Sequence, residues 1–279
     1  MVNFNGTIFE TENAQLAGNR GFLYGDAVFE TLKILDGRIL FSEDHYFRLM
    51  ASMRVVRMEI PMNFTLEYFE EQVLTLANAE NCSASARARI TVYRNDGGRY
   101  LPEDHNVSFL ISVSKLENPL YQIGYTTYEV DLYKDFYVAR QLLSGIKSTN
   151  RLLNVAAAIY AKENDLQNCL LLNDEKNVIE AVQGNVFMLT DGKLVTPPVS
   201  EGCVNGVMRR QVLALAKKME HLEVLEQVIS PFDLQKADEI FITNIIIGIQ
   251  PVSKYRKKEF GSSLAQTLLQ KLNTQIRLG

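Results

Sequence analysis

The stretch Ser144-Gly145-Ile146-Lys147-Ser148-Thr149-Asn150-Arg151-Leu152 sets a lysine between a small residue pair and a polar turn, just before a helical pattern. Such a lysine has two interpretations: a helix-start residue in solvent, as most lysines are, or a nucleophilic amine held in a pocket. Farther along, Glu180 interrupts the apolar strand pattern that begins at Val178. A buried carboxylate needs a cationic or hydrogen-bonding partner, so Glu180 is either half of a structural salt bridge or a functional group.

Composition excludes several classes of function. The 279 residues include 47% apolar and 22% charged residues, which is ordinary for a soluble globular protein. A net charge of −4 provides no basic field for nucleic acid or an anionic membrane, and no apolar run approaches the roughly 18 residues that span a bilayer. Three scattered cysteines suit reduced thiols in the cytoplasm. We expect a cytoplasmic protein with no nucleic-acid or membrane partner and no bound metal.

Turn signals divide the chain into short elements. Asn5-Gly6 closes a first strand over residues 3–10, and Asp36-Gly37 and Asp191-Gly192 predict hairpins. Apolar residues at helical spacing predict amphipathic helices over 66–79 and 151–163. The apolar face of the second helix suits either the core or a dimer contact. The continuous apolar run at residues 169–172 is typical of a strand covered on both faces.

These patterns predict an α/β protein with two domains. The run Leu116-Glu117-Asn118-Pro119 breaks the strand pattern. We therefore place a small N-terminal α/β domain at 1–116, a linker at 117–124 and a larger C-terminal domain at 125–279.

Three further features have both an ordinary and a functional interpretation. Arg48 flanks the apolar stripe of a predicted helix, where its head lies in water or, at a cleft, holds a phosphate. Arg94 and Arg99 bracket a glycine turn that is either a solvated loop or a carboxylate-binding site. Gly206 precedes a predicted helix whose first N–H groups could approach an anion.

Together these residues provide what pyridoxal 5′-phosphate requires. An amine forms the Schiff base, and a carboxylate keeps the pyridine nitrogen protonated so that the ring is an electron sink. A cationic fork and a helix N-terminus hold the phosphate dianion. A free lysine is a poor nucleophile at neutral pH, so the amine needs a desolvated or cationic setting.

The chain also resembles the class IV aminotransferases, the fold-type IV pyridoxal-phosphate enzymes. The motifs that carry this resemblance follow the family's order across nearly the whole chain: Tyr24-Gly25-Asp26-Ala27-Val28-Phe29-Glu30-Thr31, His45-Tyr46-Phe47-Arg48-Leu49, Lys147-Ser148-Thr149-Asn150-Arg151, Glu180 with Asn185-Val186-Phe187, Gly202-Cys203-Val204-Asn205-Gly206-Val207-Met208-Arg209, and Ala237-Asp238-Glu239.

The resemblance implies a role for each matching residue. Lys147 looks like the Schiff-base lysine, Glu180 like the partner of the pyridine nitrogen, and Arg48 like a phosphate ligand. The backbone N–H groups of Val207 and Met208 look like the rest of the phosphate cradle, and Gly206 and Asn244 are also expected to bind the cofactor. The family's fold has the cofactor between two α/β domains, the larger a pseudo-barrel, and its members are usually homodimers whose neighbouring subunit helps to close the site.

Departures from the aminotransferase pattern favour the family's 4-amino-4-deoxychorismate lyases, which release pyruvate and form 4-aminobenzoate for folate. The segment after Glu180 lacks the usual hydroxyl groups, Thr243-Asn244-Ile245-Ile246 resembles a lyase segment, and so does the turn from Arg94 to Tyr100. A tyrosine typical of branched-chain aminotransferases is replaced by Leu152. A transaminase of branched-chain or other amino acids is the alternative, and a cofactor-binding protein without catalysis is a remote one.

The substrate is expected to be a small amino compound that carries a carboxylate. Arg94 and Arg99 are the candidates for binding that carboxylate, because a guanidinium can hold it through two parallel hydrogen bonds. Tyr24 and Phe29 are the candidates for the apolar wall of the substrate site.

Overall fold

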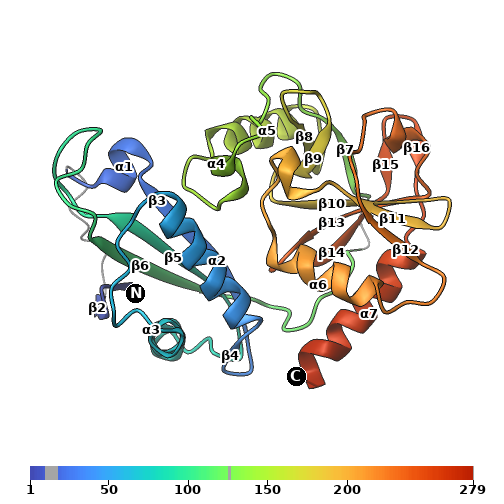
Figure 1. Cartoon of the computed structure of the whole chain (residues 1–279). Coiled ribbons are helices and arrows are strands. Elements are labelled where there is room, and N and C mark those ends of the chain that lie inside the picture. The colour runs from blue at the N-terminus through green and yellow to red at the C-terminus, as the bar shows by residue number, and fades with distance from the viewer. Residues whose placement is uncertain (10–17, 125–126, 279) are drawn as a thin grey trace. The chain divides into compact units, whose positions relative to one another are not determined.

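The structure, a computed structural model, describes residues 1–9, 18–124 and 127–278. Its contacts divide the chain into two units. Unit 1 comprises Met1–Pro119 with Ile146–Asn150, and unit 2 comprises Leu120–Gly145 with Arg151–Gly279. The predicted start of the second domain, at residue 125, lies outside the described residues. The predicted α/β class is confirmed, because helices and sheets occur in both units (Figure 1).

Unit 1 is built on a six-stranded antiparallel sheet in the order β2-β1-β6-β5-β3-β4. Its elements are β1 (Val2–Phe4), β2 (Thr7–Phe9), α1 (Arg20–Tyr24), β3 (Ala27–Leu35), β4 (Arg38–Ile39), α2 (Ser42–Val55), α3 (Leu66–Ala79), β5 (Ser85–Arg94) and β6 (Val107–Lys115). Alternate residues of β5, from Ala86 to Val92, are fully buried in one hydrophobic core with α2 and α3. The predicted helix over 66–79 is thus confirmed as α3.

Three tight turns share one backbone signature. Asn5-Gly6 has φ values of 46° and 87°, Asp36-Gly37 of 49° and 75°, and Asp191-Gly192 of 48° and 74°. Positive φ at both central residues matches the right-handed twist of hairpin strands. The two Asp-Gly hairpins are confirmed. The prediction of a single first strand over residues 3–10 is wrong for residues 3–9, because the chain reverses at Asn5-Gly6 and forms β1 and β2. Residue 10 lies outside the described residues.

The segment 146–150 pairs with the start of β3. Phe29 N–H donates to Lys147 C=O over 2.8 Å, and Thr149 N–H donates to Ala27 C=O over 3.0 Å. These bonds flank an antiparallel bridge between Val28 and Ser148. The predicted boundaries assign the segment to the second domain, whereas this pairing attaches it to the sheet of unit 1.

Unit 2 contains a ten-stranded sheet. Its strands are β7 (Glu129–Leu132), β8 (Asn168–Leu172), β9 (Val178–Ala181), β10 (Gly184–Thr190), β11 (Lys193–Thr196), β12 (Glu223–Glu226), β13 (Glu239–Asn244), β14 (Gly248–Val252), β15 (Lys254–Tyr255) and β16 (Lys258–Glu259). One edge of β10 pairs with β13, while its other edge pairs first with β9 and then with β11. This change of partner lets the sheet curl around a core.

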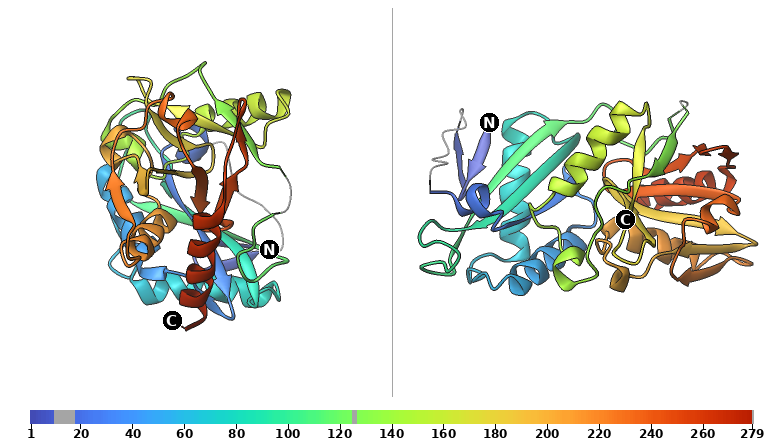
Figure 2. Two further views of the ribbon diagram at one scale, coloured as in Figure 1. Left: turned by 90° about the vertical axis from the view of Figure 1, so that its right-hand side faces the viewer. Right: turned by 90° about the horizontal axis from the view of Figure 1, so that it is seen from above.

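The helices of unit 2 are α4 (Leu142–Gly145), α5 (Leu152–Glu163), α6 (Val207–Ala216) and α7 (Ser263–Leu278), with short 3₁₀ turns at Val199–Glu201 and Asp233–Gln235. Helices α6 and α7 contact each other, and both contact β13 (Figures 1 and 2). Strand β8 is buried along its whole length between two hydrophobic clusters, as its apolar run predicts.

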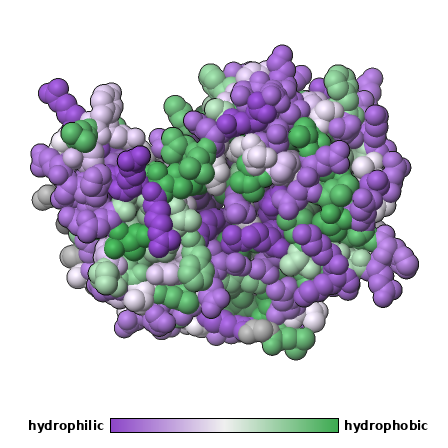
Figure 3. All heavy atoms as spheres, viewed as in Figure 1, coloured by the Kyte–Doolittle hydropathy of each residue, from purple (hydrophilic) through white to green (hydrophobic). Residues whose placement is uncertain are grey.

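The predicted apolar face of α5 is largely exposed. Leu152, Val155 and Ile159 are 81%, 52% and 53% exposed, whereas the buried residues of the helix are Ala157 and Ala161. The visible surface is mainly hydrophilic and is interrupted by hydrophobic side chains (Figure 3). Among the described residues, no helix has both the length and the apolar character needed to cross a membrane.

Candidate active site

Lys147 is held next to an aromatic ring in unit 1. Its backbone is fixed opposite Phe29 by the pairing with β3, and its Nζ lies 4.6 Å from the centroid of the Phe29 ring. The Cζ atom of Arg89 lies 3.7 Å from the same centroid. Lys147 is half-buried and lies outside the helices, since α5 begins only at Leu152. It is therefore not an exposed helix-start residue.

Arg48 forms a two-point ion pair with a buried carboxylate of β3. Its Nε donates to Glu30 Oε1 over 2.7 Å and its Nη2 donates to Glu30 Oε2 over 2.6 Å. His45, one helical turn before Arg48 on α2, contacts Glu30 Oε2 through Nδ1 over 2.8 Å. Burial raises the pKa of Glu30, but the charge of Arg48 and the bond from His45 outweigh it and lower that pKa to about 2. Glu30 is thus a carboxylate that orders two side chains of α2.

Glu180 points toward the loop that precedes α6. Its Oε2 accepts a 2.9 Å hydrogen bond from the backbone N–H of Val204. Asn185, the cross-strand neighbour of Glu180, donates from Nδ2 to the C=O of Val204 over 2.8 Å. The two side chains therefore hold one residue of the loop from both sides. Glu180 is 6% exposed, so the predicted buried carboxylate is present in β9.

Helix α6 is preceded by Gly206, where there is no space for a side chain. A Cβ on Gly206 would lie 2.0 Å from Asn185 Oδ1, so only glycine fits there without rearrangement. No side chain caps this helix end, and its first turn contains no acidic residue. Intrahelical bonds start with Arg210 N–H to Gly206 C=O, which leaves the N–H groups of Val207 and Met208 outside the helical ladder. Such an end suits an anion.

Asn244, at the end of β13, shapes the turn that follows it. Its Oδ1 accepts from the N–H groups of Ile246 and Ile247 over 2.9 and 3.0 Å, and its Nδ2 donates to Gln183 C=O over 3.0 Å. The neighbouring Thr243 is 1% exposed, and its Oγ1 has no hydrogen-bond partner. Asn244 thus holds the turn together, in addition to any contact with a ligand.

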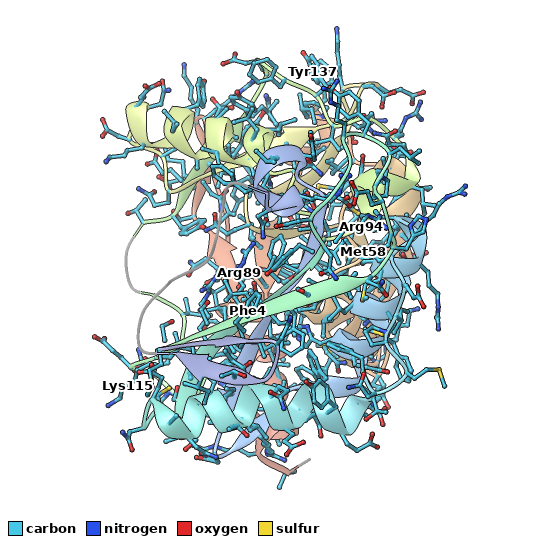
Figure 4. The ribbon with its side chains drawn as sticks, turned by 90° about the vertical axis from the view of Figure 1, so that its left-hand side faces the viewer. Phe4, Met58, Arg89, Arg94, Lys115 and Tyr137 are labelled. Atoms are coloured by element: carbon cyan, nitrogen blue, oxygen red, sulfur yellow. The ribbon has the colours of Figure 1, made fainter. Side chains whose placement is uncertain are left out.

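Arg94, a candidate for binding the substrate carboxylate, has a structural role in unit 1. Its Nε donates to Asp26 Oδ2 over 2.9 Å, Nη2 to Val56 C=O over 2.7 Å, and Nη1 to Arg57 C=O and His105 Nδ1 over 3.0 and 2.9 Å. These bonds use four of its five N–H groups, and the residue is 5% exposed. Figure 4 shows Arg94 near Met58, which directly follows Val56 and Arg57 in the chain.

Arg99 and Tyr24 lie together at the turn that Arg94 precedes. Arg20, buried under the turn, donates from Nη1 to the carbonyl groups of Gly97 and Arg99 over 2.9 and 2.6 Å. The Tyr24 ring lies 5.8 Å from the ring of Tyr100. The backbone of the turn is therefore fixed, while the side chain of Arg99 is exposed.

The site residues thus form two groups. Unit 1 brings Lys147 beside Phe29 and, on the other face of β3, Arg48 beside Glu30. The pKa of His45 is lowered, mainly by burial. The charge of Lys147 is near enough to contribute to this lowering. Unit 2 brings Glu180 beside the loop into α6, next to the turn of Asn244. In the described residues no group of histidine, cysteine and acidic side chains is arranged to hold a metal ion.

Sequence reasoning missed Glu30, His45 and Asn185 as functional positions, although all three lie in the quoted motifs. The signal for Glu30 is an acidic residue at a core-facing position of an apolar strand, as for Glu180. His45 and Arg48 are three residues apart on one helix, a spacing that brings two side chains onto the same face.

Unit 1 contains a half-buried lysine, and unit 2 contains a strand carboxylate and an uncapped helix N-terminus; these are the kinds of groups that an anionic aldehyde cofactor requires. A model of the class IV aminotransferase family matches residues 27–255. The chain belongs to this family.

The similar proteins have three different activities. A putative branched-chain-amino-acid aminotransferase of Methanocaldococcus jannaschii is 29% identical over 99% of this chain and 95% of its own. An aminodeoxychorismate lyase of Vibrio harveyi is 28% identical over 85% of each chain, and a D-alanine aminotransferase of Listeria monocytogenes is 28% identical over 89% and 85%. The branched-chain aminotransferase of Thermobaculum terrenum, solved in its PLP-form, has the same fold, with a TM-score of 0.84, 22% identity and coverage of 99% and 92%.

Class IV aminotransferases are pyridoxal-phosphate enzymes, so pyridoxal 5′-phosphate is the cofactor of this chain. The residues present fit it. The α6 N-terminus after Gly206 has no side-chain cap and could hold a phosphate, and Arg48 is a guanidinium fork of the kind that binds one. Glu180 is a buried carboxylate of the kind that keeps a pyridine nitrogen protonated.

Proposed function

We propose that this enzyme acts on a small amino substrate through a Schiff base at Lys147, and that its reaction is that of a 4-amino-4-deoxychorismate lyase. The observation that carries the chemistry is the placement of Lys147: a half-buried amine, fixed by strand pairing and held against the Phe29 ring, which Arg89 also contacts. When bound, pyridoxal 5′-phosphate supplies the electron sink for reactions at the substrate carbons.

Lys147 has two tasks in this proposal. Its amine would hold the aldehyde group of the cofactor, and the same amine would move protons at the substrate as general base and acid. The antiparallel pairing with β3 keeps the backbone of Lys147 in place, so only the flexible side chain has to move between these tasks.

The other residues hold the cofactor. Glu180 keeps the pyridine nitrogen protonated, and its bond to Val204 also orders the loop before α6. Arg48 and the N–H groups of Val207 and Met208 bind the phosphate, where a guanidinium fork and a helix dipole both favour negative charge. Phe29 gives the apolar wall beside the amine.

The turn around Arg99 supports the lyase reaction. A Cβ on Gly98 would lie 2.2 Å from Leu101 C=O, and Gly98 has a φ of 69°, so the Gly-Gly pair is required for this turn. The pair lies between the two arginines that this turn shares with the lyase pattern. Arg20 fixes the backbone and leaves the Arg99 side chain exposed, where it can bind a substrate carboxylate.

A transaminase is the second candidate. The M. jannaschii relative, a putative branched-chain aminotransferase, matches 99% of this chain, which is more than the lyase relative does. The lyase and transaminase reactions share the residues that bind the cofactor, so these residues do not separate them.

Two experiments test the function. Borohydride reduction of the yellow protein should attach the cofactor to Lys147, as peptide mapping will show; protein that stays colourless with the cofactor contradicts the proposal and leaves a non-catalytic role. Aminodeoxychorismate should then yield pyruvate. Formation of glutamate from leucine and 2-oxoglutarate, without pyruvate from aminodeoxychorismate, would establish the transaminase instead.

We also propose that the enzyme works as a homodimer, as the family's members usually do. The exposed apolar residues of α4 and α5, among them Leu142, Leu152 and Val155, support an interface on this part of unit 2, since a monomer rarely exposes several large apolar side chains together. Light scattering should give a dimer mass, and Val155→Glu should lower it. A monomeric wild-type protein would contradict this.

A further inference from the structure

We propose that Glu30 is a positioning residue for the cofactor phosphate: it fixes the guanidinium of Arg48 and is itself oriented by His45. This inference rests on the proposed function, in which Arg48 binds the phosphate. Neither Glu30 nor His45 takes part in the proposed mechanism, although both side chains are almost fully buried next to Arg48.

The three side chains form one hydrogen-bonded network. Glu30 faces the core between Val28 and Leu32, and both of its oxygens are used: Oε1 accepts from Arg48, and Oε2 accepts from Arg48 and His45. The side chains of Glu30, His45 and Arg48 are 1%, 0% and 10% exposed. Charge-assisted hydrogen bonds away from water are the strong ones, so this network is well ordered before any ligand binds.

The pairing sets the plane of the Arg48 guanidinium. Glu30 takes the Nε and Nη2 edge, so the Nη1 end is not part of this ion pair. An arginine side chain has many rotamers, and a ligand that has to order them binds less tightly. Glu30 removes this cost in advance. It also balances the positive charge of Arg48, so this ion pair has no net charge, and the nearby Lys147 supplies the positive charge that remains for a phosphate dianion.

His45 acts through one of its two ring nitrogens. Glu30 is ionised and can only accept, so Nδ1 of His45 carries the hydrogen of the 2.8 Å contact. The other nitrogen, Nε2, is buried and has no hydrogen-bond partner. Loss of Nε2 therefore costs no hydrogen bond, whereas loss of the Nδ1 donor removes one of the three bonds that orient Glu30.

This difference provides a matched pair of variants. His45→Asn keeps an N–H near the position of Nδ1, and His45→Gln keeps only a nitrogen near the position of Nε2. Glu30→Gln keeps the size of the side chain but removes the charge that pairs with Arg48. Glu239→Gln is the control, because Glu239 is also a buried carboxylate, 5% exposed, and caps the start of α7 in unit 2, whereas Glu30, His45 and Arg48 belong to unit 1.

The experiment compares pyridoxal 5′-phosphate with pyridoxal, which lacks the phosphate. Each variant is titrated with both compounds, and the absorbance of the Lys147 adduct gives two dissociation constants. Glu30→Gln should weaken binding of the phosphate compound by about tenfold or more and change binding of pyridoxal by less than about threefold, because a charge-assisted contact to the phosphate is affected. His45→Gln should shift the ratio in the same direction, while His45→Asn and Glu239→Gln should resemble the wild type.

The outcomes separate the two levels of inference. An unchanged ratio of dissociation constants in folded Glu30→Gln overturns the positioning role, and so does a loss in His45→Asn that His45→Gln does not show. If Glu30→Gln does not fold, the histidine pair decides alone. Failure of the proposed function looks different: wild-type protein then forms no adduct with either compound, or forms it equally well after Lys147→Ala.

Discussion

Glu180 and Asn185 face each other across β9 and β10 and hold the two backbone groups of one residue, Val204. Glu180 accepts from its N–H over 2.9 Å, and Asn185 donates to its C=O over 2.8 Å. A short hairpin joins the two strands, so the five-residue spacing of the pair is set by strand geometry. The carboxylate that is proposed to contact the pyridine ring thus also positions the loop that leads to α6, the helix proposed to bind the phosphate.

Asn185→Ala should loosen this loop. We expect the free energy of unfolding to fall by about 1 kcal/mol or somewhat more, because the C=O of Val204 loses its hydrogen bond in a part-buried position. Urea unfolding of the apoprotein measures the change. Gln266→Ala, which removes an exposed side-chain hydrogen bond on α7, is the control and should have a much smaller effect. Equal effects of the two substitutions would contradict the role of Asn185.

Gly206→Ala tests the close approach of the same side chain. The new Cβ would lie 2.0 Å from Asn185 Oδ1, so one of the two groups has to move and the protein should be destabilised. In an Asn185→Ala background this collision is absent. We therefore expect a double-mutant cycle to show a coupling of about 1 kcal/mol or more between the two substitutions. The same cost for Gly206→Ala in both backgrounds would show that another contact requires the glycine.

Local signals in the sequence were sufficient for much of the fold. The two Asp-Gly hairpins follow from the positive φ that their turns need, and α3 follows from an apolar stripe at helical spacing. The exposure of Leu152 and Val155 could not be predicted in this way. Periodicity shows that one face of a helix is apolar, but it does not show whether the chain itself covers that face.

The candidate site was predictable where a residue type is costly in its position, as with Glu180 in an apolar strand. The structural role of Arg94 could not be predicted, because its partners come from segments far away in the sequence, such as Val56 and Asp26. A pair of arginines around a turn looks symmetrical in the sequence. Only the fold shows that one of them is buried and the other exposed.

Arg94→Met and Arg99→Ala should therefore differ sharply. We expect Arg94→Met to lower the free energy of unfolding by about 3 kcal/mol, since it leaves two carbonyl groups in part-buried bonds and the carboxylate of Asp26 with fewer donors. Arg99→Ala, at an exposed position, should change stability by less than about 0.5 kcal/mol but weaken substrate binding. Thermal unfolding and KM together check both expectations. A stable Arg94→Met protein with raised KM would indicate that Arg94 binds the substrate.

Lys33 should make stability depend on alkaline pH. It is 2% exposed, and burial lowers its pKa from 10.5 to about 8. Between these two values the unfolded chain binds the proton and the folded chain does not, so the free energy of unfolding should rise with pH across this window. Lys33→Met should lack this rise. Unfolding curves of both proteins at several pH values measure the difference, and parallel pH profiles would contradict the lowered pKa.

Glu30 should have the opposite relation to acid, because its charged form is the one that the fold favours. Its pKa is lowered from 4.5 to about 2: burial raises it, but Arg48 and His45 outweigh burial. Above pH 4.5 the carboxylate is ionised in both states and its stabilisation is complete. As the pH falls toward 2, the unfolded chain takes up the proton first, so this stabilisation is lost progressively.

Glu30→Gln cannot titrate. The stability difference between wild type and Glu30→Gln should therefore be largest near neutral pH and shrink below pH 4.5. A difference that stays constant throughout this range would mean that Glu30 titrates alike in the folded and unfolded chains, and that the Arg48 pair does not stabilise the fold.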